Sequence, residues 1–328
     1  MNWNLSEEDR GLVEAATDAA ERAGAIHRTY AGRLDSGAWE EKGTSDFVTD
    51  VDREAERAIV EVLLERFPDH EILAEESATD AVVPGPGDPI VPGPGDPSGG
   101  PAEGAGSEGR GAAIRWIVDP LDGTTNWLHG YPEYAVSIAA VDGAGQRIAL
   151  VLNSATGERF TAVRGRGSRL DGQPIQTSGI HQLRLALVGT GFPFKRPDLL
   201  PRYLQSFQRV LEATSGVRRG GAAALDLCNV ACGRLDAFWE FWLLPWDFAA
   251  GLLIIREAGG VAESFPPPPP GPASGPRQTS GWEPVGRGAG GAPAIHVAGS
   301  AAAIEAAGVI AANPHLFRTF RDLALQQR

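Results

Sequence analysis

The residues best suited to chemistry lie in two acidic segments far apart in the chain. The first is Asp-Pro-Leu-Asp-Gly-Thr-Thr-Asn at 119–126, and the second is Trp-Asp-Phe-Ala-Ala-Gly at 246–251. Residues 114–118 before the first segment are β-branched and aromatic, as is typical of a buried strand. Because burying an unpaired carboxylate is costly, we expect Asp119 and Asp122 to be solvated or neutralised by cations.

Two carboxylates, a backbone carbonyl and a hydroxyl on one turn are hard oxygen ligands of the kind that Mg²⁺ accepts. An ordinary turn is the alternative interpretation, because Asp-Pro and Asp-Gly pairs are common turn formers. The segment at 119–126 therefore predicts either a magnesium site or a plain surface turn, and the rest of the chain must decide between them.

The net charge of −13 over 328 residues limits the classes of partner. It argues against nucleic acid or an anionic membrane as the main ligand. It would also repel an anionic substrate, unless bound divalent cations reverse the sign locally. The acidity therefore favours a cation-dependent site over one lined by arginine.

Other features of the composition exclude several classes of site. The six His show no pair at ligand spacing, so a zinc site has no support. Cys228 and Cys232 are four apart, which is helical spacing, and we interpret them as small buried residues. The amino terminus has a helix cap at Ser6 followed by acidic residues rather than a basic and then apolar signal. We expect a soluble, cytoplasmic protein.

The hydrophobic periodicity predicts alternating helices and strands. The expected helices cover 6–34, about 52–66, 198–213, 222–232, 247–257 and a final stretch with Pro314 at its first position. The expected strands cover 71–76, 114–118, 134–142, 147–153, 184–189 and 235–240, with a hairpin turn at 142–145. This order suggests a layered α/β sandwich.

Two Pro/Gly-rich segments interrupt this pattern, at about 81–113 and 265–293. In the first, Val-Pro-Gly-Pro-Gly-Asp-Pro occurs twice, at 83–89 and 91–97. Such composition cannot pack a core, so we expect mobile insertions in a single domain spanning 1–328. The ends of the first insertion are expected to lie close together if Glu75 and Asp119 share a site.

The two acidic motifs, together with Glu75-Glu76 and the segment 46–52, resemble the inositol monophosphatase family of Mg²⁺-dependent, lithium-sensitive phosphatases. The resemblance covers nearly the whole chain except the insertions. It implies alternating α-β-α-β-α layers, as in the superfamily that also includes fructose bisphosphatase. It also implies two or three Mg²⁺ ions per site, with Mn²⁺ as a substitute and Li⁺ as an inhibitor, and a homodimer.

The same resemblance implies a set of metal ligands. The side chains of Glu75, Asp119, Asp122 and Asp247 would bind the ions, and Leu121 would contribute its backbone carbonyl. Two ions about 4 Å apart can clamp the attacking and leaving oxygens of a phosphoryl transfer. We expect one ion to activate a water for direct attack, without a covalent phosphoenzyme.

The resemblance also implies roles for residues around the metals. Asp52 matches the family residue that polarises the Thr124 hydroxyl and orients the water, and a helix N-cap is the alternative interpretation. Gly123 and Thr124 would bind phosphate through amides and a hydroxyl. Glu240 matches a position that hydrogen-bonds an inositol hydroxyl; its alternative is a solvated strand-end carboxylate.

The remaining substrate contacts implied by the resemblance are Gly221, Ala222, Ala223 and, again, Asp247. At Ala222 the family usually carries Ser or Thr, so the hydroxyl is lost and the contact there becomes backbone-only.

The predicted function is hydrolysis of inositol 1-phosphate to inositol and phosphate. One alternative is another phosphatase of the superfamily, acting on histidinol phosphate, fructose bisphosphate or adenosine bisphosphate. The Thr124-Thr125-Asn126 triplet favours the inositol branch, because nucleotide-bisphosphate branches tend to carry Lys at the second position. A second alternative is a regulatory binding protein, because some bacterial relatives are linked to the transcription machinery.

Overall fold

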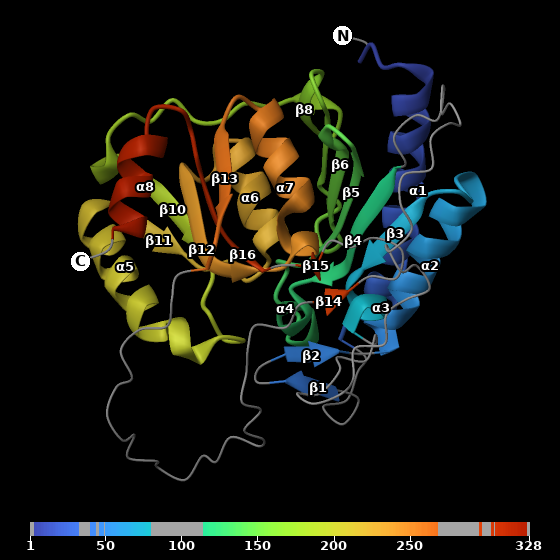
Figure 1. Ribbon diagram of the computed structural model, residues 1–328, viewed down its shortest axis with the longest axis horizontal. Coiled ribbons are helices and arrows are strands. Elements are labelled where there is room, and N and C mark those ends of the chain that lie inside the picture. The colour runs from blue at the N-terminus through green and yellow to red at the C-terminus, as the bar shows by residue number, and fades with distance from the viewer. Residues whose placement is uncertain are drawn as a thin grey trace, which may run out of the picture.

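The computed structural model describes residues 3–32, 40–43, 46–48, 50–79, 114–267, 295–296, 303–304 and 306–326. The insertion predicted at 81–113 lies outside the described residues, as does most of the one predicted at 265–293. The described elements form five layers, helices–sheet–helices–sheet–helices, which are seen edge-on in Figure 1. This confirms the predicted α-β-α-β-α sandwich.

The larger sheet has seven strands in sequential order, and only its first pair is parallel. Its strands are β3 (Glu71–Ala74), β4 (Arg115–Asp122), β5 (Ala135–Asp142), β6 (Gly145–Asn153), β7 (Arg159–Val163), β8 (Gly167–Leu170) and β9 (Gln173–Pro174). The predicted hairpin between β5 and β6 is present, with Asp142 paired to Gly145.

The smaller sheet has the order β11-β10-β12-β16-β13. Its strands are β10 (Leu187–Thr190), β11 (Gly216–Arg218), β12 (Ala237–Leu243), β13 (Val261–Phe265) and β16 (Ala307–Ala312). Two short antiparallel pairs lie apart from these sheets, β1 (Glu40–Gly43) with β2 (Asp46–Val48) and β14 (Ile295–His296) with β15 (Ala303–Ile304).

Three pairs of helices cover the sheet faces (Figure 1). The outer face of the larger sheet carries α1 (Glu7–Tyr30) and α2 (Asp50–Arg66). Between the sheets lie α6 (Ala223–Ala231) and α7 (Pro245–Glu257), and on the outer face of the smaller sheet lie α5 (Leu200–Ala213) and α8 (Phe317–Leu325). The short helices are α3 (Glu75–Thr79) and α4 (Thr124–Leu128), and the 3₁₀ turns are η2 (Leu183–Leu185) and η3 (Pro197–Leu199).

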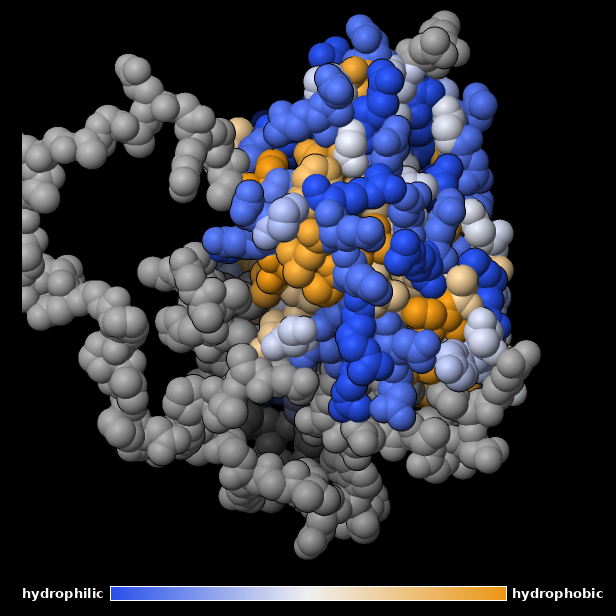
Figure 2. All heavy atoms as spheres, turned by 90° about the vertical axis from the view of Figure 1, so that its right-hand side faces the viewer, coloured by the Kyte–Doolittle hydropathy of each residue, from blue (hydrophilic) through white to orange (hydrophobic). Residues whose placement is uncertain are grey.

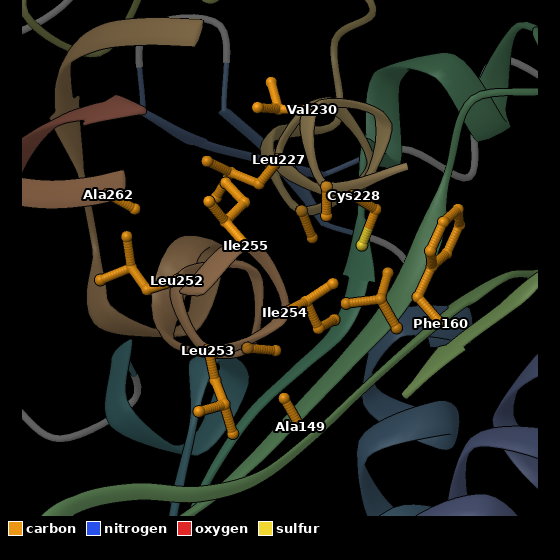
Figure 3. Close-up of a cluster of buried hydrophobic side chains, with 14 of the residues drawn as sticks. Ala149, Phe160, Leu227, Cys228, Val230, Leu252, Leu253, Ile254, Ile255 and Ala262 are labelled. Atoms are coloured by element: carbon orange, nitrogen blue, oxygen red, sulfur yellow. The ribbon is translucent and has the colours of Figure 1, made fainter. Parts of the chain in front are cut away.

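The central layer explains why α7 is apolar on all sides. Its consecutive residues Leu252, Leu253, Ile254 and Ile255 are all buried, as expected of a helix enclosed on every face. Figure 3 shows these side chains pointing in different directions, toward α6, β13 and the strands of the larger sheet. Cys228 of α6 lies in the same apolar cluster, and burial raises the pKa of its thiol, as expected of a packing residue.

The outer helical layer faces solvent. Figure 2 shows a mostly hydrophilic surface over α1 and α2 with scattered apolar areas, and Leu64 of α2 is one exposed apolar side chain there. The opposite stripe of α1 buries five alanines against α2 and β6. Within the described residues, no helix is long and apolar enough to cross a membrane.

Several element boundaries differ from the predictions for local reasons. Helix α1 ends at Tyr30 rather than 34 and is followed by Gly32 at a φ of 69°. Helix α8 begins at Phe317, so Pro314 is not its first residue; Pro314 lies in a turn where the Asn313 side chain accepts the backbone N–H of Leu316. The strand predicted at 184–189 divides into η2 and β10.

Candidate active site

The parallel register of β3 and β4 brings the first two acidic positions together. Ala74 pairs with Val118, so Glu75 and Asp119 each follow a paired residue at the same edge of the sheet. Parallel neighbours need a crossover. The carboxyl end of β3 and the amino end of β4 therefore lie at opposite edges of the sheet. Glu75 and Asp119 are therefore neighbours because of strand register, and not because the ends of the insertion meet.

A β-bulge presents the next carboxylate. β4 continues through the acidic motif, and its pairing with β5 shifts between Asp119 and Asp122. The Leu121 backbone N–H donates to Asp119 Oδ1 at 3.0 Å, and the Ala224 N–H at the start of α6 donates to Asp122 Oδ2 at 2.7 Å. Because Asp119 is 1% and Asp122 9% exposed, neither is solvated as a surface side chain would be, and neutralisation is the expectation that remains.

The second motif enters from the central helix layer. Asp247 lies in the first turn of α7, where its Oδ2 accepts the backbone N–H of Leu244 at 2.6 Å. The Ser137 hydroxyl of β5 donates to the carbonyl of Trp246 at 3.2 Å. Since Ser137 is paired with Asp119 across β4 and β5, this bond ties the start of α7 to the acidic end of β4.

A cavity of about 390 Å³ opens where these elements meet. Every predicted metal and substrate residue lines it: Glu75, Asp119, Leu121, Asp122, Gly123, Thr124, Gly221, Ala222, Ala223, Glu240 and Asp247. Asp52 is not part of the lining, but its carboxylate lies behind Thr124. The geometry thus brings together side chains from both sheets and from both motifs.

The carboxylates perturb one another strongly. Burial, followed by the charges of Glu75, Asp122 and Asp247, raises the pKa of Asp119 well above its ordinary value. Burial and the charge of Asp247 likewise raise the pKa of Asp122, and the N–H of Ala224 opposes the shift. Burial, with Asp247 and Asp226, raises the pKa of Glu240 as well. A cavity of this kind favours whatever neutralises it, either protons or cations.

The donor set fits hard divalent cations in its chemistry. It consists of carboxylates with the Leu121 carbonyl, and oxygen ligands of this type suit Mg²⁺. Among the described residues, however, no three Asp, Glu, His or Cys side chains are placed closely enough to hold an ion as they stand. Like charges at these positions repel one another, and a bound cation would reverse the sign of that interaction.

The Thr124 hydroxyl lies between two acceptors. Its Oγ1 is 3.1 Å from Asp52 Oδ1 and 3.1 Å from the carbonyl oxygen of Leu121. Asp52 belongs to the first turn of α2 and is only 2% exposed, so its carboxylate is held against Thr124 rather than in solvent. The preceding Gly123 has a φ of 88°, and a Cβ there would lie 2.8 Å from the carbonyl oxygen of Glu133; this turn requires glycine.

The loop before α6 is joined to the same turn. The Asn126 side-chain amide donates to the carbonyls of Glu133 at 2.6 Å and Gly220 at 3.0 Å. This contact holds the segment 219–223 against the acidic motif. The sequence placed Asn126 in the motif without a role; the sharing of one amide by two loops follows only from the tertiary structure.

On the opposite wall, Glu240 of β12 packs against a glycine. A Cβ at Gly191 would lie 2.0–2.3 Å from the Glu240 carboxyl group, so a side chain there would displace this carboxyl group. The Glu240 carboxyl is thereby placed at the cavity wall, and it is not the freely solvated strand-end group of the alternative interpretation.

Further lining residues were missed by the sequence interpretation. Arg219 lies over the rings of Phe192 and Phe194, with its guanidinium 5.6 and 5.3 Å from their centroids. Burial raises the pKa of Asp226 to about 8, with a further contribution from Glu133. The basic pair at 218–219 next to two glycines was the available signal, although nothing in its spacing revealed the acidic cavity. The other missed lining residues are Thr125, Pro193, Lys195, Trp242 and Leu243.

Comparisons with known proteins place the chain in a family. The family model described as "Inositol monophosphatase family" matches residues 8–272. Nus factor SuhB of Pseudomonas aeruginosa is 43% identical over 256 residues, covering 77% of this chain and 85% of that protein. Nus factor SuhB of Escherichia coli is 36% identical over 254 residues, with the same coverage of 77% and 85%.

Two solved structures extend the similarity to the fold. The extragenic suppressor protein suhB from Bartonella henselae superposes with a TM-score of 0.69 at 29% identity, covering 97% of this chain and 99% of that one. The inositol monophosphatase from Anabaena gives a TM-score of 0.65 at 26% identity, covering 97% of each chain. Because the family model matches most of this chain, the chain belongs to the inositol monophosphatase family.

Proposed function

We propose that this protein is a Mg²⁺-dependent phosphomonoester hydrolase that releases phosphate from an inositol monophosphate. The observation that carries the proposal is the meeting of Glu75, Asp119, Asp122 and Asp247 at one cavity, with the pKa of Asp119 and of Asp122 raised. Such a site is unfavourable to the folded protein unless protons or cations neutralise its carboxylates. The family membership gives the same chemistry a precedent.

Divalent ions would supply the Lewis acid for the phosphoryl group and lower the pKa of a water molecule. Glu75, Asp119, Asp122, Asp247 and the Leu121 carbonyl would hold them. Mg²⁺ is the proposed ion, with Mn²⁺ as a substitute, because the donors are all oxygen.

The protein groups then orient the reactants. When the Thr124 hydroxyl donates to Asp52, an Oγ1 lone pair is left to accept a hydrogen bond from the attacking water. As the water loses its proton to Oγ1, the Thr124 hydroxyl proton would pass to the Asp52 carboxylate. The backbone N–H groups of the turn at Gly123 and Thr124 would bind the phosphate oxygens. Direct attack by water is the step we propose; the described residues lining the cavity include no Cys, His or Ser.

The leaving group is proposed to lie between Glu240 and the segment 221–223. Glu240 would hydrogen-bond a hydroxyl of the polyol, and the backbone of Ala222 and Ala223 would contact the ring. Arg219 adds a positive charge to this side of the cavity and lowers the pKa of Glu240, against the larger effect of burial.

The proposal is tested by phosphate release from inositol 1-phosphate, measured with and without Mg²⁺. Histidinol phosphate, fructose 1,6-bisphosphate and adenosine 3′,5′-bisphosphate serve as competing substrates, and Glu75→Gln serves as a matched inactive protein. We expect Mg²⁺-dependent release that is fastest with the inositol ester. No release from any of these esters at saturating Mg²⁺ would contradict the proposal.

A second candidate function is participation in transcription, because the curated relatives named above are Nus factors. This function would not require an intact metal site. A transcription antitermination assay with wild-type protein and with the Glu75→Gln variant separates the two possibilities: activity retained in the variant would indicate a binding role independent of hydrolysis.

A further inference from the structure

Glu56 is a buried carboxylate that plays no part in the mechanism above. It lies on α2 and is 5% exposed, with Ala55 and Ile59 buried beside it on the same helix. An acidic side chain in such surroundings is costly unless several hydrogen bonds compensate it. The position of Glu56 therefore calls for a structural reason.

Among the described residues, the hydrogen bonds that compensate Glu56 come from the turn that follows β3. Oε2 of Glu56 accepts the backbone N–H of Glu76 at 2.7 Å, and Oε1 accepts the backbone N–H of Ser77 at 2.9 Å. The Ser77 hydroxyl also donates to Oε1. The N–H groups in the first turn of a helix have no partner within the helix, and Glu56 satisfies two of them in α3.

These two amides directly follow Glu75, the first residue of α3. Fixing them fixes the backbone from which the Glu75 side chain enters the cavity. Glu56 also lies one helical turn after Asp52, so both carboxylates are on the same face of α2. That face thus contacts both catalytic loops, with Asp52 bound to Thr124 and Glu56 bound to the α3 turn.

We propose that Glu56 is a positioning residue that orients Glu75 for cation binding. The inference rests on the proposed function, because it assigns Glu56 a purpose only if Glu75 binds a metal ion. Groups that orient metal ligands are worth about 10- to 100-fold in metal affinity or activity when removed.

Glu56→Gln tests this inference while keeping the length of the side chain. One carboxylate oxygen is replaced by an NH₂ group that faces a backbone N–H, so the turn is released. We expect the full-length variant to bind Mn²⁺ about 10- to 100-fold more weakly by titration calorimetry. The Mg²⁺ concentration for half-maximal hydrolysis should rise by a similar factor, whereas kcat at saturating Mg²⁺ should remain within a few-fold of wild type.

Two further variants make the test specific. Glu61→Gln removes an exposed carboxylate from the same helix and should leave Mn²⁺ affinity unchanged. Ser77→Ala removes one of the three bonds and should weaken Mn²⁺ binding by only a few-fold, which keeps the test decisive if Glu56→Gln fails to fold. A general structural defect would lower kcat without being rescued by Mg²⁺.

The possible outcomes separate the two proposals. Wild-type protein that binds Mn²⁺ and hydrolyses the ester, together with variants at Glu56 and Ser77 that bind Mn²⁺ as wild type does, would overturn the positioning role alone. Wild-type protein that neither binds Mn²⁺ nor hydrolyses any ester would overturn the proposed function, and the positioning role with it.

Discussion

At the scale of single residues, the site buries carboxylates close to one another, which disfavours their charged forms. Asp119 is almost fully buried, yet three other carboxylates contribute to the rise in its pKa. A group whose pKa is raised in the folded state stabilises that state at low pH and loses the contribution as pH rises through its folded pKa. Without cations, the charged form of Asp119 therefore destabilises the folded protein at neutral pH.

Asp119→Asn follows from this balance. Without metal at pH 7.5, the variant should melt at a higher temperature than wild type, because one charge is removed from the repelling set. With Mg²⁺ its hydrolysis should fall by at least about 100-fold, since even groups that merely orient a ligand are worth up to that factor. Calorimetric melting and phosphate release measure the two effects; near-normal turnover at saturating Mg²⁺ would remove Asp119 from the ligand set.

Glu240→Gln tests whether Glu240 contacts the leaving group. The amide keeps the shape that lies beside Gly191 but replaces one carboxyl oxygen, an acceptor, by an NH₂ group that can only donate. A mismatched buried polar partner costs about 1–3 kcal/mol, or roughly 10- to 100-fold in specificity.

We therefore expect kcat/KM for inositol 1-phosphate to fall by about that factor, while p-nitrophenyl phosphate, which has no hydroxyls, is spared. Steady-state kinetics on both esters provide the comparison. Equal losses on the two substrates would mean that Glu240 supports the site structurally and does not recognise a polyol.

At the scale of elements, α1 is anchored to the larger sheet by a histidine that cannot be charged there. His27 is fully buried, with Nδ1 2.9 Å from the Ser154 hydroxyl, and its Nε2 has no hydrogen-bond partner among the described residues. Burial, with a smaller contribution from Arg28, lowers the pKa of His27 to about 3. The backbone carbonyl of His27 also accepts the indole N–H of Trp127, which ties α1 to α4 beside the phosphate turn.

The sign of the pH effect follows from the lowered pKa. Below the ordinary His pKa of about 6.5, His27 binds a proton in the unfolded chain but not in the folded one. The free energy of unfolding therefore falls as pH falls toward 3. Between pH 6.5 and 5 this amounts to about 2 kcal/mol.

His27→Gln should remove about that much of the acid-dependent loss, while His181→Gln, at an exposed position, should not. Urea unfolding at pH 7 and pH 5 measures the difference. Parallel losses in wild type and in His27→Gln would show that His27 is not the titrating group.

At the scale of the whole molecule, the cavity depends on a crossover that spans a Pro/Gly-rich segment. β3 and β4 are paired in parallel, and residues 81–113 lie between them in the sequence. The composition of this segment offers little apolar surface for a core.

Replacing residues 84–110 with a Gly/Ser linker of about ten residues should therefore change the melting temperature by less than about 3 °C, because the entropy of loop closure varies slowly with length. Phosphate release should be retained, since no proposed site residue lies in the segment. A large fall in melting temperature, measured by calorimetry with wild type as reference, would show that the segment packs on the body of the protein.

Much of the site was predictable because its signals are local. The strand before Asp119, the turn residues that follow it and the position of Asp247 at a helix start are all encoded within a few residues. The helical period also identified α1 and α2, and the order of elements indicated the layered architecture. The resemblance to a family then named the residues that line the cavity.

The tertiary structure alone decided which distant groups meet. The register of β3 on β4, the link from Asn126 to Gly220, the packing of Glu240 against Gly191 and the bonds from Glu56 to α3 join positions that are 20 to 94 residues apart in the chain. Local periodicity reports which face of an element is buried, but not which neighbour covers it. The packing of both sheets around α6 and α7 decides which elements are neighbours. This packing brings the separate acidic motifs together at one cavity.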